Sequence, residues 1–528
     1  MSSNSNRYFL PFIGSILIVV GILIGFVLSK PNSMLSASSG KYEQKLADVI
    51  QILEQEYVDT VNKEALFEET ISDMLHRLDP HSNYIPARDL KRMSESIEGK
   101  FGGVGVRFTI LNDTLNITNV IVGSPAYQVG VKQFDQIIAV EGENVAGVEL
   151  TNTRVQELLK GEAGTDVNVE ILRGDKKLQK TITRGMVPIE SVNASFMMNE
   201  KVGYIRLSQF SLQSDKEFYL AAIDLMSKGM TKLIFDLRYN GGGVMGSAVN
   251  IVDALIEKGL PIVSTKGKNS PEKTLYAENT PILADIELVV LINESSASAS
   301  EIVAGAIQDN DRGTIIGRRS FGKGLVQQDI NLKDGSNLRL TVSRYYTPTG
   351  RCIQKPYSGD YEEYMMDEYS RYENGELYEV DSSLFVDSLK YTTPEGKTVY
   401  GGGGIMPDIF VPLDTTNSST YFRRLRYANS FADFAYNYVR FNKMQQWEGF
   451  KEFEAGFKVT EKMLSDFTTY AEEQYDVDFD KNQFEAAKMR IKENIKAEIA
   501  RQIWLEQGAF YILNQSDREV NRALEYLN

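Results

Sequence analysis

Residues 288–302, LVVLINESSASASEI, join an aliphatic run to a cluster of serines at the start of a helical pattern. The run at 288–292 has the composition of a buried strand. Ser298-Ala-Ser-Glu301 fits the capping box S-x-x-E, in which a serine caps a helix and a glutamate reciprocates. A serine at a helix N-terminus also lies where backbone N–H groups stabilise developing negative charge. The stretch therefore predicts a strand, a turn and a helix, and the turn serine has two candidate roles, helix cap and nucleophile.

A second segment, FGKGLVQ at residues 321–327, places Lys323 between two glycines, with Gln327 four residues later. The glycines let the backbone approach its neighbours closely and let a lysine enter a confined site. A lysine acts as a base only when it is neutral, so burial or nearby positive charge must lower its pKa from about 10.4. Gln327 is spaced to orient the lysine through a hydrogen bond. The alternative is an ordinary solvated loop lysine.

Residues 317–324, GRRSFGKG, nearly match the phosphate-binding loop G-x-x-x-x-G-K-[ST]. Gly324 replaces the hydroxyl residue that would bind magnesium, and residues 325–330 alternate like a strand instead of opening a helix. Without a helix N-terminus there is no dipole to hold a phosphate. We therefore expect no nucleotide site here.

Asp236-Leu-Arg-Tyr-Asn-Gly-Gly-Gly243 follows a strand pattern and precedes a helical one. The simple interpretation is a glycine-rich turn between a strand and a helix. The functional interpretation is an oxyanion hole, because no side chains screen the N–H groups of glycines. Asn240 is suited to brace the turn through its side chain.

The 528-residue chain has two histidines, His76 and His81, and one cysteine, Cys352. Neither histidine lies near a glycine-rich turn, which disfavours a Ser-His-Asp triad. One cysteine permits no internal disulfide and no cysteine-rich metal site. A net charge of −15 argues against a nucleic-acid partner. We therefore expect no metal, no cofactor and no nucleic acid.

Residues 9–28 form a nearly unbroken apolar stretch without charge, long enough to cross a bilayer. The stretch is longer than the apolar part of a typical signal peptide, although Ser36-Ala-Ser38 is a weak cleavage-like site. The sequence predicts an uncleaved anchor, with a cleaved signal peptide as the alternative. Either reading places the rest of the chain outside the cytoplasm.

The pattern of apolar and polar residues changes several times along the chain after this stretch. Apolar spacing over 41–77 is helical, and residues 99–184 read as short strands and turns. Expected strands at 203–207, 232–237, 286–292 and 313–316 alternate with expected helices such as 214–228 and 246–258. This alternation predicts βαβ units with buried strands. Residues 357–389 form an acidic, tyrosine-rich surface insertion, and the chain is mostly helical from Ser419.

Taken in order, the motifs resemble the carboxyl-terminal processing peptidases of the S41 serine peptidase family. The resemblance covers about residues 41–412. It rests on LDPHS at 78–82, FGGVGV at 101–106, DLRYNGG at 236–242, SASASEI at 296–302, FGKG at 321–324 and YTPTGR at 346–351.

The resemblance implies roles for particular residues. Ser298 is the expected nucleophile, Lys323 the general base and Gln327 the residue that orients the lysine. The expected oxyanion donors are the N–H groups of Ala299 and of Gly242 or Gly243. Residues 99–184 resemble a PDZ domain, which holds the terminal carboxylate of a peptide on loop N–H groups while the peptide adds as a strand. The residues expected in that loop are Gly102, Gly103, Val104, Gly105 and Val106.

The implied architecture is an α/β peptidase core of the ClpP/crotonase type with an inserted PDZ-like domain and helical N- and C-terminal regions. We expect a transmembrane helix at 9–28, an N-terminal helical region at 41–95, the PDZ-like domain at 96–185, the peptidase core at 190–356 and 400–412, the insertion at 357–399 and a C-terminal helical region at 413–528. The C-terminal helices are expected to act in homodimerisation or as a lid.

The chain departs from the family pattern at two turns. Gly241 stands where the family has proline, which loosens the turn and leaves the oxyanion glycine open. Phe134, before Asp135, stands where the PDZ pattern has glycine.

The sequence therefore predicts a membrane-tethered, ATP-independent serine endopeptidase at the inner (cytoplasmic) membrane, with its catalytic part in the periplasm. Its expected substrates are proteins with exposed C-terminal tails. The rival from another class is a noncatalytic scaffold that gathers partners through the PDZ-like domain. The joint presence of Ser298, Lys323 and Gln327 counts against that rival.

Overall fold

The computed structural model describes residues 41–381, 383, 385–442, 444 and 446–528. The predicted transmembrane stretch at 9–28 lies outside these residues. Among the residues described, no helix combines the length and the apolar character needed to cross a membrane. The chain divides after Met74 into two compact units.

The first unit is helical, as predicted for this region. Helix α2 (Lys41–Glu56) has no buried residue, and helix α3 (Lys63–His76) crosses the boundary of the unit at Met74. Apolar side chains of both helices, including Leu46, Leu53 and Phe67, line a small pocket between them.

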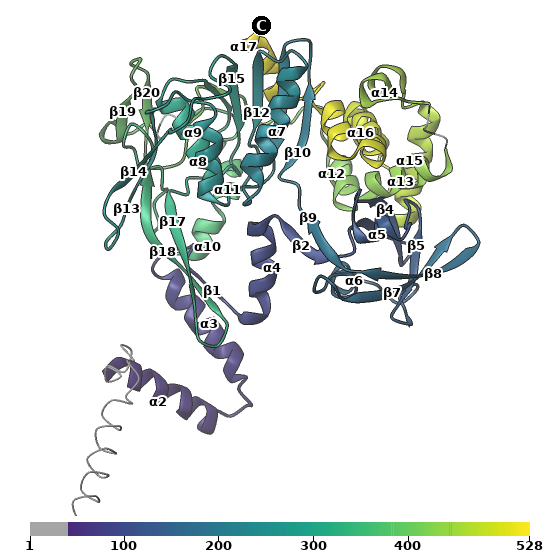
Figure 1. The fold of residues 1–528 in the computed structure, drawn as a ribbon, viewed down its shortest axis with the longest axis horizontal. Coiled ribbons are helices and arrows are strands. Elements are labelled where there is room, and N and C mark those ends of the chain that lie inside the picture. The colour runs from purple at the N-terminus through teal and green to yellow at the C-terminus, as the bar shows by residue number, and fades with distance from the viewer. Residues whose placement is uncertain (1–40, 382, 384, 443, 445) are drawn as a thin grey trace, which may run out of the picture. The chain divides into compact units, whose positions relative to one another are not determined.

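A six-stranded sheet forms the centre of the second unit, in the order β10-β11-β12-β15-β16-β21 (Figure 1). Its strands are β10 (Val192–Met197), β11 (Val202–Leu207), β12 (Lys232–Asp236), β15 (Glu287–Ile292), β16 (Thr314–Gly317) and β21 (Ile409–Phe410). The strands from β11 to β21 are parallel, and β10 is an antiparallel edge. The helices between them are α7 (Ser214–Ser227), α8 (Met245–Asp253) and α9 (Ala299–Asp309). The predicted βαβ alternation is confirmed.

Both faces of this sheet are covered. Ile205, Phe235 and Val290 enter one hydrophobic cluster with residues of α7, α8 and α9. Tyr204 and Ile234 face the other way, into a cluster with the C-terminal helix α17 (Arg518–Leu527). Burial on both faces explains why these strands are continuous apolar runs in the sequence.

A second, antiparallel sheet carries the segment after Lys323. It contains β1 (Asn83–Ile85), β13 (Pro261–Lys266), β14 (Lys273–Tyr276), β17 (Leu325–Asn331) and β18 (Asn337–Tyr346). Strand β18 pairs with both β17 and β1. The strand predicted at 325–330 is confirmed, so the GRRSFGKG segment leads into a strand and not into the helix of a phosphate-binding loop.

Residues 100–188 form a separate β-rich part with its own hydrophobic cluster. Its main sheet has the path β3-β4-β5-β7-β8. The elements are β3 (Val106–Leu111), β4 (Thr114–Val120), α5 (Pro125–Gln128), β5 (Gln136–Val140), β6 (Glu143–Asn144), α6 (Asn152–Leu159), β7 (Asp166–Arg173) and β8 (Lys176–Thr183). Strands β2 (Lys100–Gly103) and β9 (Gly185–Pro188) pair at its base, after helix α4 (Ala87–Glu98).

The C-terminal region is helical, as predicted. It contains α12 (Thr420–Tyr427), α13 (Ser430–Phe441), α14 (Phe450–Gly456), α15 (Glu461–Tyr475) and α16 (Lys481–Leu513), which share one aromatic-rich cluster.

The insertion at 357–399 contains α10 (Tyr361–Met365), α11 (Asp367–Glu373), β19 (Lys390–Thr392) and β20 (Thr398–Tyr400). The prediction of a purely surface insertion is wrong in one respect, because Tyr364 and Arg371 are buried.

Candidate active site

Ser298 lies in the turn between β15 and α9 with φ 55° and ψ −111°. This left-handed conformation is strained for any residue with a side chain. The turn is anchored on the carbonyl of Asn240, which accepts from the Ala297 N–H (3.0 Å) and from the Ser300 hydroxyl (2.8 Å). Backbone strain that the surroundings enforce in this way is typical of functional sites.

Glu301 joins the serine turn to the lysine loop. Its buried carboxylate accepts hydrogen bonds from the N–H of Ser298 (2.8 Å), the N–H of Gly322 (2.7 Å), the N–H of Lys323 (2.9 Å) and the hydroxyl of Ser320 (2.5 Å). Burial raises the pKa of Glu301, and these donors oppose the rise. The glutamate half of the predicted capping box is present, because the Glu301 carboxylate accepts from the N–H of Ser298, the residue before α9.

Tyr345, on β18, links the same two segments a second time. Its buried hydroxyl lies 2.6 Å from the carbonyl of Lys323 and 3.0 Å from the carbonyl of Ser298, and it shares its proton between them. Burial raises the pKa of Tyr345 well above its ordinary value, so the hydroxyl stays a donor. Glu301 and Tyr345 together fix the backbones of Ser298 and Lys323 to one another.

The environment of Lys323 favours the neutral amine. Burial lowers the pKa of Lys323 below its ordinary 10.5, and Arg339 lowers it further. The carboxylates of Asp79 and Glu301 act in the opposite direction and are outweighed. This is the direction that a general base working below the pKa of free lysine requires.

Gln327 is held at both ends of its amide. Its Oε1 accepts from Lys323 Nζ at 3.0 Å, and its Nε2 donates to the backbone carbonyl of His81. The imidazole of His81 is engaged elsewhere, with Nε2 2.9 Å from the hydroxyl of Tyr364. Burial, and then the charge of Lys323, lower the pKa of His81 to about 3, so its ring is neutral near pH 7.

The glycine-rich turn lies directly against Ser298. A Cβ on Gly242 would be 2.8 Å from the Ser298 Cβ and 2.9 Å from the backbone nitrogen of Ala299, so only glycine fits there. Asn240 braces the turn as predicted, because its Oδ1 accepts from the Gly242 N–H at 2.9 Å. The N–H groups of Ala299 and Gly243 make no hydrogen bond within the described part of the chain. Of the two candidate glycines, Gly243 is therefore the one with an uncommitted donor.

The two departures from the family pattern have different structural outcomes. Gly241 does not have a positive φ, and a Cβ there would meet nothing within 4 Å, so the position does not require glycine. Phe134 takes φ 70°, a conformation that glycine adopts more readily. Its ring packs against Tyr436 of α13, with ring centroids 5.4 Å apart, and this contact compensates for the backbone strain.

The loop predicted to bind a peptide carboxylate is shorter than expected. Gly102 and Gly103 belong to β2, which pairs with β9, and Val106 begins β3. Only Val104 and Gly105 lie between these strands. Strand β3 is the end of its sheet and has a free edge among the described residues. A free edge beside such a loop is the arrangement that PDZ domains offer to a peptide.

Comparison with known proteins identifies the relatives of this arrangement. Residues 201–362 match peptidase family S41, residues 102–183 match the PDZ domain, and residues 421–505 match a family of unknown function. The carboxy-terminal-processing protease of Bartonella bacilliformis is 38% identical over 317 residues, which are 59% of this chain and 72% of the relative. The chain belongs to peptidase family S41.

Other relatives carry similar names. The carboxy-terminal processing protease CtpB of Bacillus subtilis is 34% identical over 320 residues, covering 60% of this chain and 66% of the relative. Among solved structures, a photosystem II D1 C-terminal processing protease is 30% identical and covers 60% of this chain and 85% of its own, with a TM-score of 0.35. The chain is thus a carboxy-terminal processing serine protease of family S41 that contains a PDZ domain.

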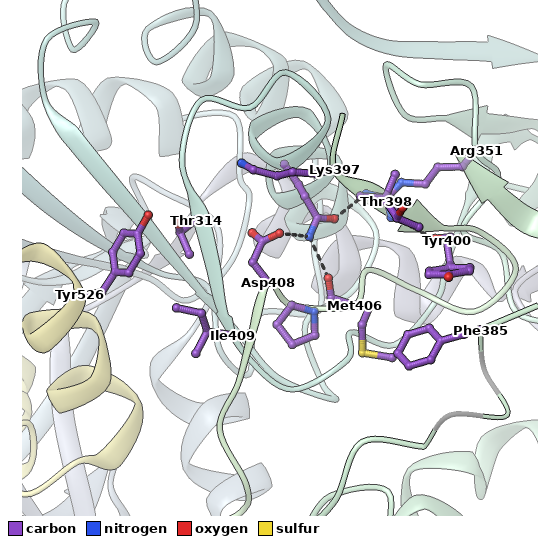
Figure 2. Close-up of a pocket in the computed structure, with 13 residues that line it drawn as sticks. Thr314, Arg351, Phe385, Lys397, Thr398, Tyr400, Met406, Asp408, Ile409 and Tyr526 are labelled. Atoms are coloured by element: carbon purple, nitrogen blue, oxygen red, sulfur yellow. Dashed lines mark hydrogen bonds between the residues drawn. The ribbon is translucent and has the colours of Figure 1, made fainter. Parts of the chain in front are cut away.

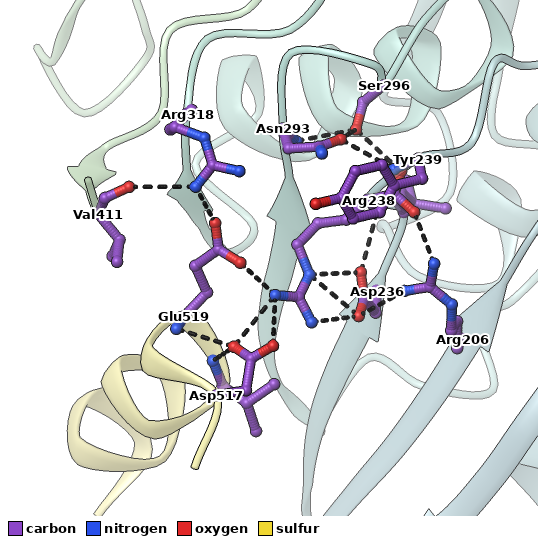
Figure 3. Close-up of polar contacts among 12 residues, drawn as sticks. Arg206, Asp236, Arg238, Tyr239, Asn293, Ser296, Arg318, Val411, Asp517 and Glu519 are labelled. Atoms are coloured by element: carbon purple, nitrogen blue, oxygen red, sulfur yellow. Dashed lines mark hydrogen bonds and ion pairs between the residues drawn. The ribbon is translucent and has the colours of Figure 1, made fainter. Parts of the chain in front are cut away.

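In this S41 chain, ion pairs join Arg238 of the DLR segment (residues 236–238) to the C-terminal helix α17 and the residue before it (Figure 3). Asp236 is fully buried and binds Arg238 (2.7 Å) and Arg206 (3.0 Å). Burial raises the pKa of Asp236, but Arg238 and Arg206 outweigh it and hold that pKa well below its usual range. Arg238 also binds Asp517 (2.9 Å) and Glu519, from the start of α17.

Glu519 connects two segments of the site, as Figure 3 shows. It contacts Arg238, which precedes the glycine-rich turn in sequence, and Arg318, at the start of the lysine loop. Arg318 in turn binds Glu294 (2.7 Å), shortly before Ser298. Helix α17 therefore supports all three loops of the candidate site.

A pocket of about 530 Å³ lies at the other end of α9 from Ser298 (Figure 2). Its wall includes Gln308, which donates to the Met406 carbonyl (2.9 Å) and to Asp408 (3.0 Å). None of the predicted site residues lines this pocket. It is therefore separate from the candidate active site.

The structure adds residues that sequence reasoning missed. Tyr345 stands beside the YTPTGR motif, but nothing in the pattern shows that its hydroxyl reaches both Ser298 and Lys323. His81 lies in the LDPHS motif, whose position in the family pattern was the only signal that it belongs near the site.

Proposed function

We propose that the chain is a serine endopeptidase in which Ser298 is the nucleophile, Lys323 the general base and Gln327 the residue that orients the lysine. The observation that carries the proposal is the joint anchoring of the serine and the lysine, because Glu301 and Tyr345 each bind the backbones of both. The lowered pKa of Lys323 and its hydrogen bond to Gln327 support the role of base.

In the acylation step neutral Lys323 takes the proton of the Ser298 hydroxyl while the oxygen attacks the scissile carbonyl carbon. The N–H groups of Ala299 and Gly243 would stabilise the resulting oxyanion. The lysine ammonium gives its proton to the departing amine as the C–N bond breaks, which leaves an acyl-serine. The neutral lysine then takes a proton from water, the hydroxide oxygen attacks the ester, and the serine regains its proton as the C–O bond breaks. No step uses a nucleotide or a metal.

The PDZ domain would select the substrate. The free edge of β3 can accept an extended peptide as an added strand, and the N–H groups of the short loop at Val104 and Gly105 can bind its terminal carboxylate. We therefore propose that the enzyme processes or degrades proteins that expose a C-terminal tail.

We further propose that residues 9–28 tether the enzyme to the inner membrane in a single pass, with the catalytic part in the periplasm. The support is the length of this uncharged apolar stretch in the sequence. We also propose that the α/β core is of the ClpP/crotonase type, supported by its parallel sheet and the turn that places a serine at the start of α9.

The test is mass-spectrometric mapping of products from an unstructured protein substrate, prepared with a free or an amidated C-terminus. Wild type is expected to cleave internal bonds and to prefer the free carboxylate, while Ser298→Ala and Lys323→Ala leave the substrate intact. Ser227→Ala, at the exposed end of α7 and away from the candidate site, is the matched serine control and keeps the same cleavage sites. If Ser298→Ala gives the wild-type products at the wild-type rate, the assignment is wrong.

A further inference from the structure

The insertion at 357–399 packs against the loop that carries Lys323. The match to peptidase family S41 ends at residue 362, so most of the insertion lies outside it. Helices α10 and α11 bury two polar side chains, Tyr364 (5% exposed) and Arg371 (2% exposed). Burying an arginine is costly unless it is paired, so the partners of Arg371 show what the insertion holds in place.

Arg371 binds the carbonyl groups of three consecutive residues. Its Nη1 donates to the carbonyls of Arg319 (3.3 Å) and Ser320 (3.0 Å), and its Nη2 donates to the carbonyl of Phe321 (3.1 Å). Lys323 follows two residues later. A planar guanidinium suits such a row of acceptors, whereas the single ammonium of a lysine does not.

The loop is therefore held along both edges. Arg371 from the insertion binds the carbonyls of 319–321, and Glu301 from α9 binds the N–H groups of Gly322 and Lys323. Gly322 has φ 90° and packs against the backbone of residues 403 and 404. This contact further limits movement of the lysine loop. Loss of Arg371 would release one edge of this clamp.

The insertion also fixes Arg371 itself. Asp367 binds the guanidinium at 3.0 Å. Glu376 lies 3.9 Å from its Nε and binds Arg319 at 2.7 Å, so it connects the two arginines. On the serine side, Glu368 accepts a hydrogen bond from the hydroxyl of Ser295 (3.0 Å).

A second series of hydrogen bonds connects α10 to Lys323. The Tyr364 hydroxyl lies 2.9 Å from His81 Nε2, and the His81 carbonyl accepts from Gln327, whose Oε1 binds Lys323. The Tyr364 ring packs against Phe321, with ring centroids 6.0 Å apart. These contacts remove water from one side of the lysine loop.

We propose that α10 and α11 complete the catalytic site and that Arg371 and Tyr364 are positioning residues for Lys323. This proposal rests on the assignment of Lys323 as the base. Its consequence is electrostatic, because burial is the main cause that lowers the lysine pKa. A loosened loop would let water reach the amine and would raise that pKa toward 10.5.

The other groups around Lys323 do not cancel this effect. Arg339 from β18 lowers its pKa, and Asp79 and Glu301 raise it. His81 is neutral near pH 7, since burial and the charge of Lys323 lower its pKa to about 3. Because the rate rises as the lysine loses its proton, the acid limb of the kcat profile should move to higher pH.

The experiment compares kcat, KM and the pH profile of kcat for the full chain and its variants with an unstructured protein substrate. Arg371→Met is expected to lower kcat about a hundredfold, as displacement of a catalytic group by about 1 Å does. KM should change little, because the lost contacts do not bind substrate. The acid limb should move to higher pH, with Arg371→Lys intermediate. Tyr364→Phe removes the hydroxyl that bonds His81 and also accepts from Gln354 Nε2 (3.1 Å), and it should lower kcat about fivefold.

Two controls separate positioning from folding. Tyr369→Phe changes an exposed tyrosine of α11, the helix that carries Arg371, and should keep wild-type kinetics. Arg351→Met removes an equally buried arginine that binds Asp309 (2.6 Å) at the far end of α9. It should lower the melting temperature and leave the acid limb in place.

The proposal is wrong if Arg371→Met lowers the melting temperature but keeps the wild-type kcat per folded molecule and the wild-type acid limb. That result would make the insertion a structural support only. Failure of the underlying assignment would look different, because Lys323→Ala would then cleave as fast as wild type.

Discussion

Glu301 receives hydrogen bonds from four groups that belong to two separate segments of the chain. Its position after Ser298 makes it a helix-cap residue in the sequence, and the fold makes it the link between serine and lysine. The largely buried amine of Lys323, by contrast, has the neutral Gln327 as its partner, and no carboxylate binds its Nζ among the residues that the structure describes. A buried lysine with a neutral partner is costly for stability and useful for a base.

Glu301→Gln tests the carboxylate link. The amide places an NH₂ donor against backbone N–H groups, which cannot accept, so at least one hydrogen bond is lost. We expect kcat to fall by about a hundredfold through misalignment of Ser298 and Lys323, with a lower melting temperature. The exposed Glu257→Gln is the matched control and should match wild type in both assays. A Glu301→Gln enzyme with wild-type kcat would show that this link is unnecessary.

At the scale of elements, the loops of the candidate active site are supported by parts of the chain far away in sequence. Helix α17 supplies Asp517 and Glu519 to Arg238 and Arg318. The insertion supplies Arg371 to the lysine loop. Each loop is short, and its position depends on a buried charge brought by another element.

Glu519→Ala tests the support from α17. It leaves Arg238 and Arg318, which are 5% and 3% exposed, without one of their carboxylates. Removing one partner of a buried ion pair should lower the free energy of unfolding by about 3 kcal/mol. Urea denaturation measures this loss, and Glu525→Ala, at an exposed pair with Arg522 on the same helix, is the control. Equal stability of the two variants would contradict the role given to Glu519.

The elements were predictable where local pattern decides them. The strands of the parallel sheet are buried on both faces, so their apolar runs show in the sequence, and the turn serine precedes a helical pattern. The contacts of Tyr345 and Arg371 were not predictable, because each joins residues far apart in sequence and has no local signature. The segment that contains Arg371 is acidic and rich in tyrosine, and this composition predicts a surface insertion and not a buried arginine. The positive φ of Phe134 was also not predictable, since the ring that packs against Phe134 belongs to Tyr436 on α13, far away in sequence.

At the scale of the whole molecule, the second unit has separate hydrophobic clusters for the peptidase sheet, the PDZ domain and the C-terminal helices. The PDZ domain meets the C-terminal helices through the packing of Phe134 on Tyr436 and through polar contacts, among them Thr109 to Asp433 (2.9 Å) and Gln133 to the Gln502 carbonyl (2.8 Å). The C-terminal helices thus contact the domain proposed to select substrates, and the last helix, α17, supports the loops of the candidate site.

The central claim is that Lys323 is the general base, and chemical replacement of its amine tests it most directly. Lys323→Cys in a Cys352→Ser background leaves one thiol, because the chain has a single cysteine. Reaction with 2-bromoethylamine rebuilds a lysine-like side chain whose amine is slightly less basic. We predict that the unmodified variant is inactive, and that the modified one regains turnover with its acid limb at lower pH than wild type. Wild-type turnover by the unmodified variant, or restored turnover with an unmoved acid limb, would contradict the account.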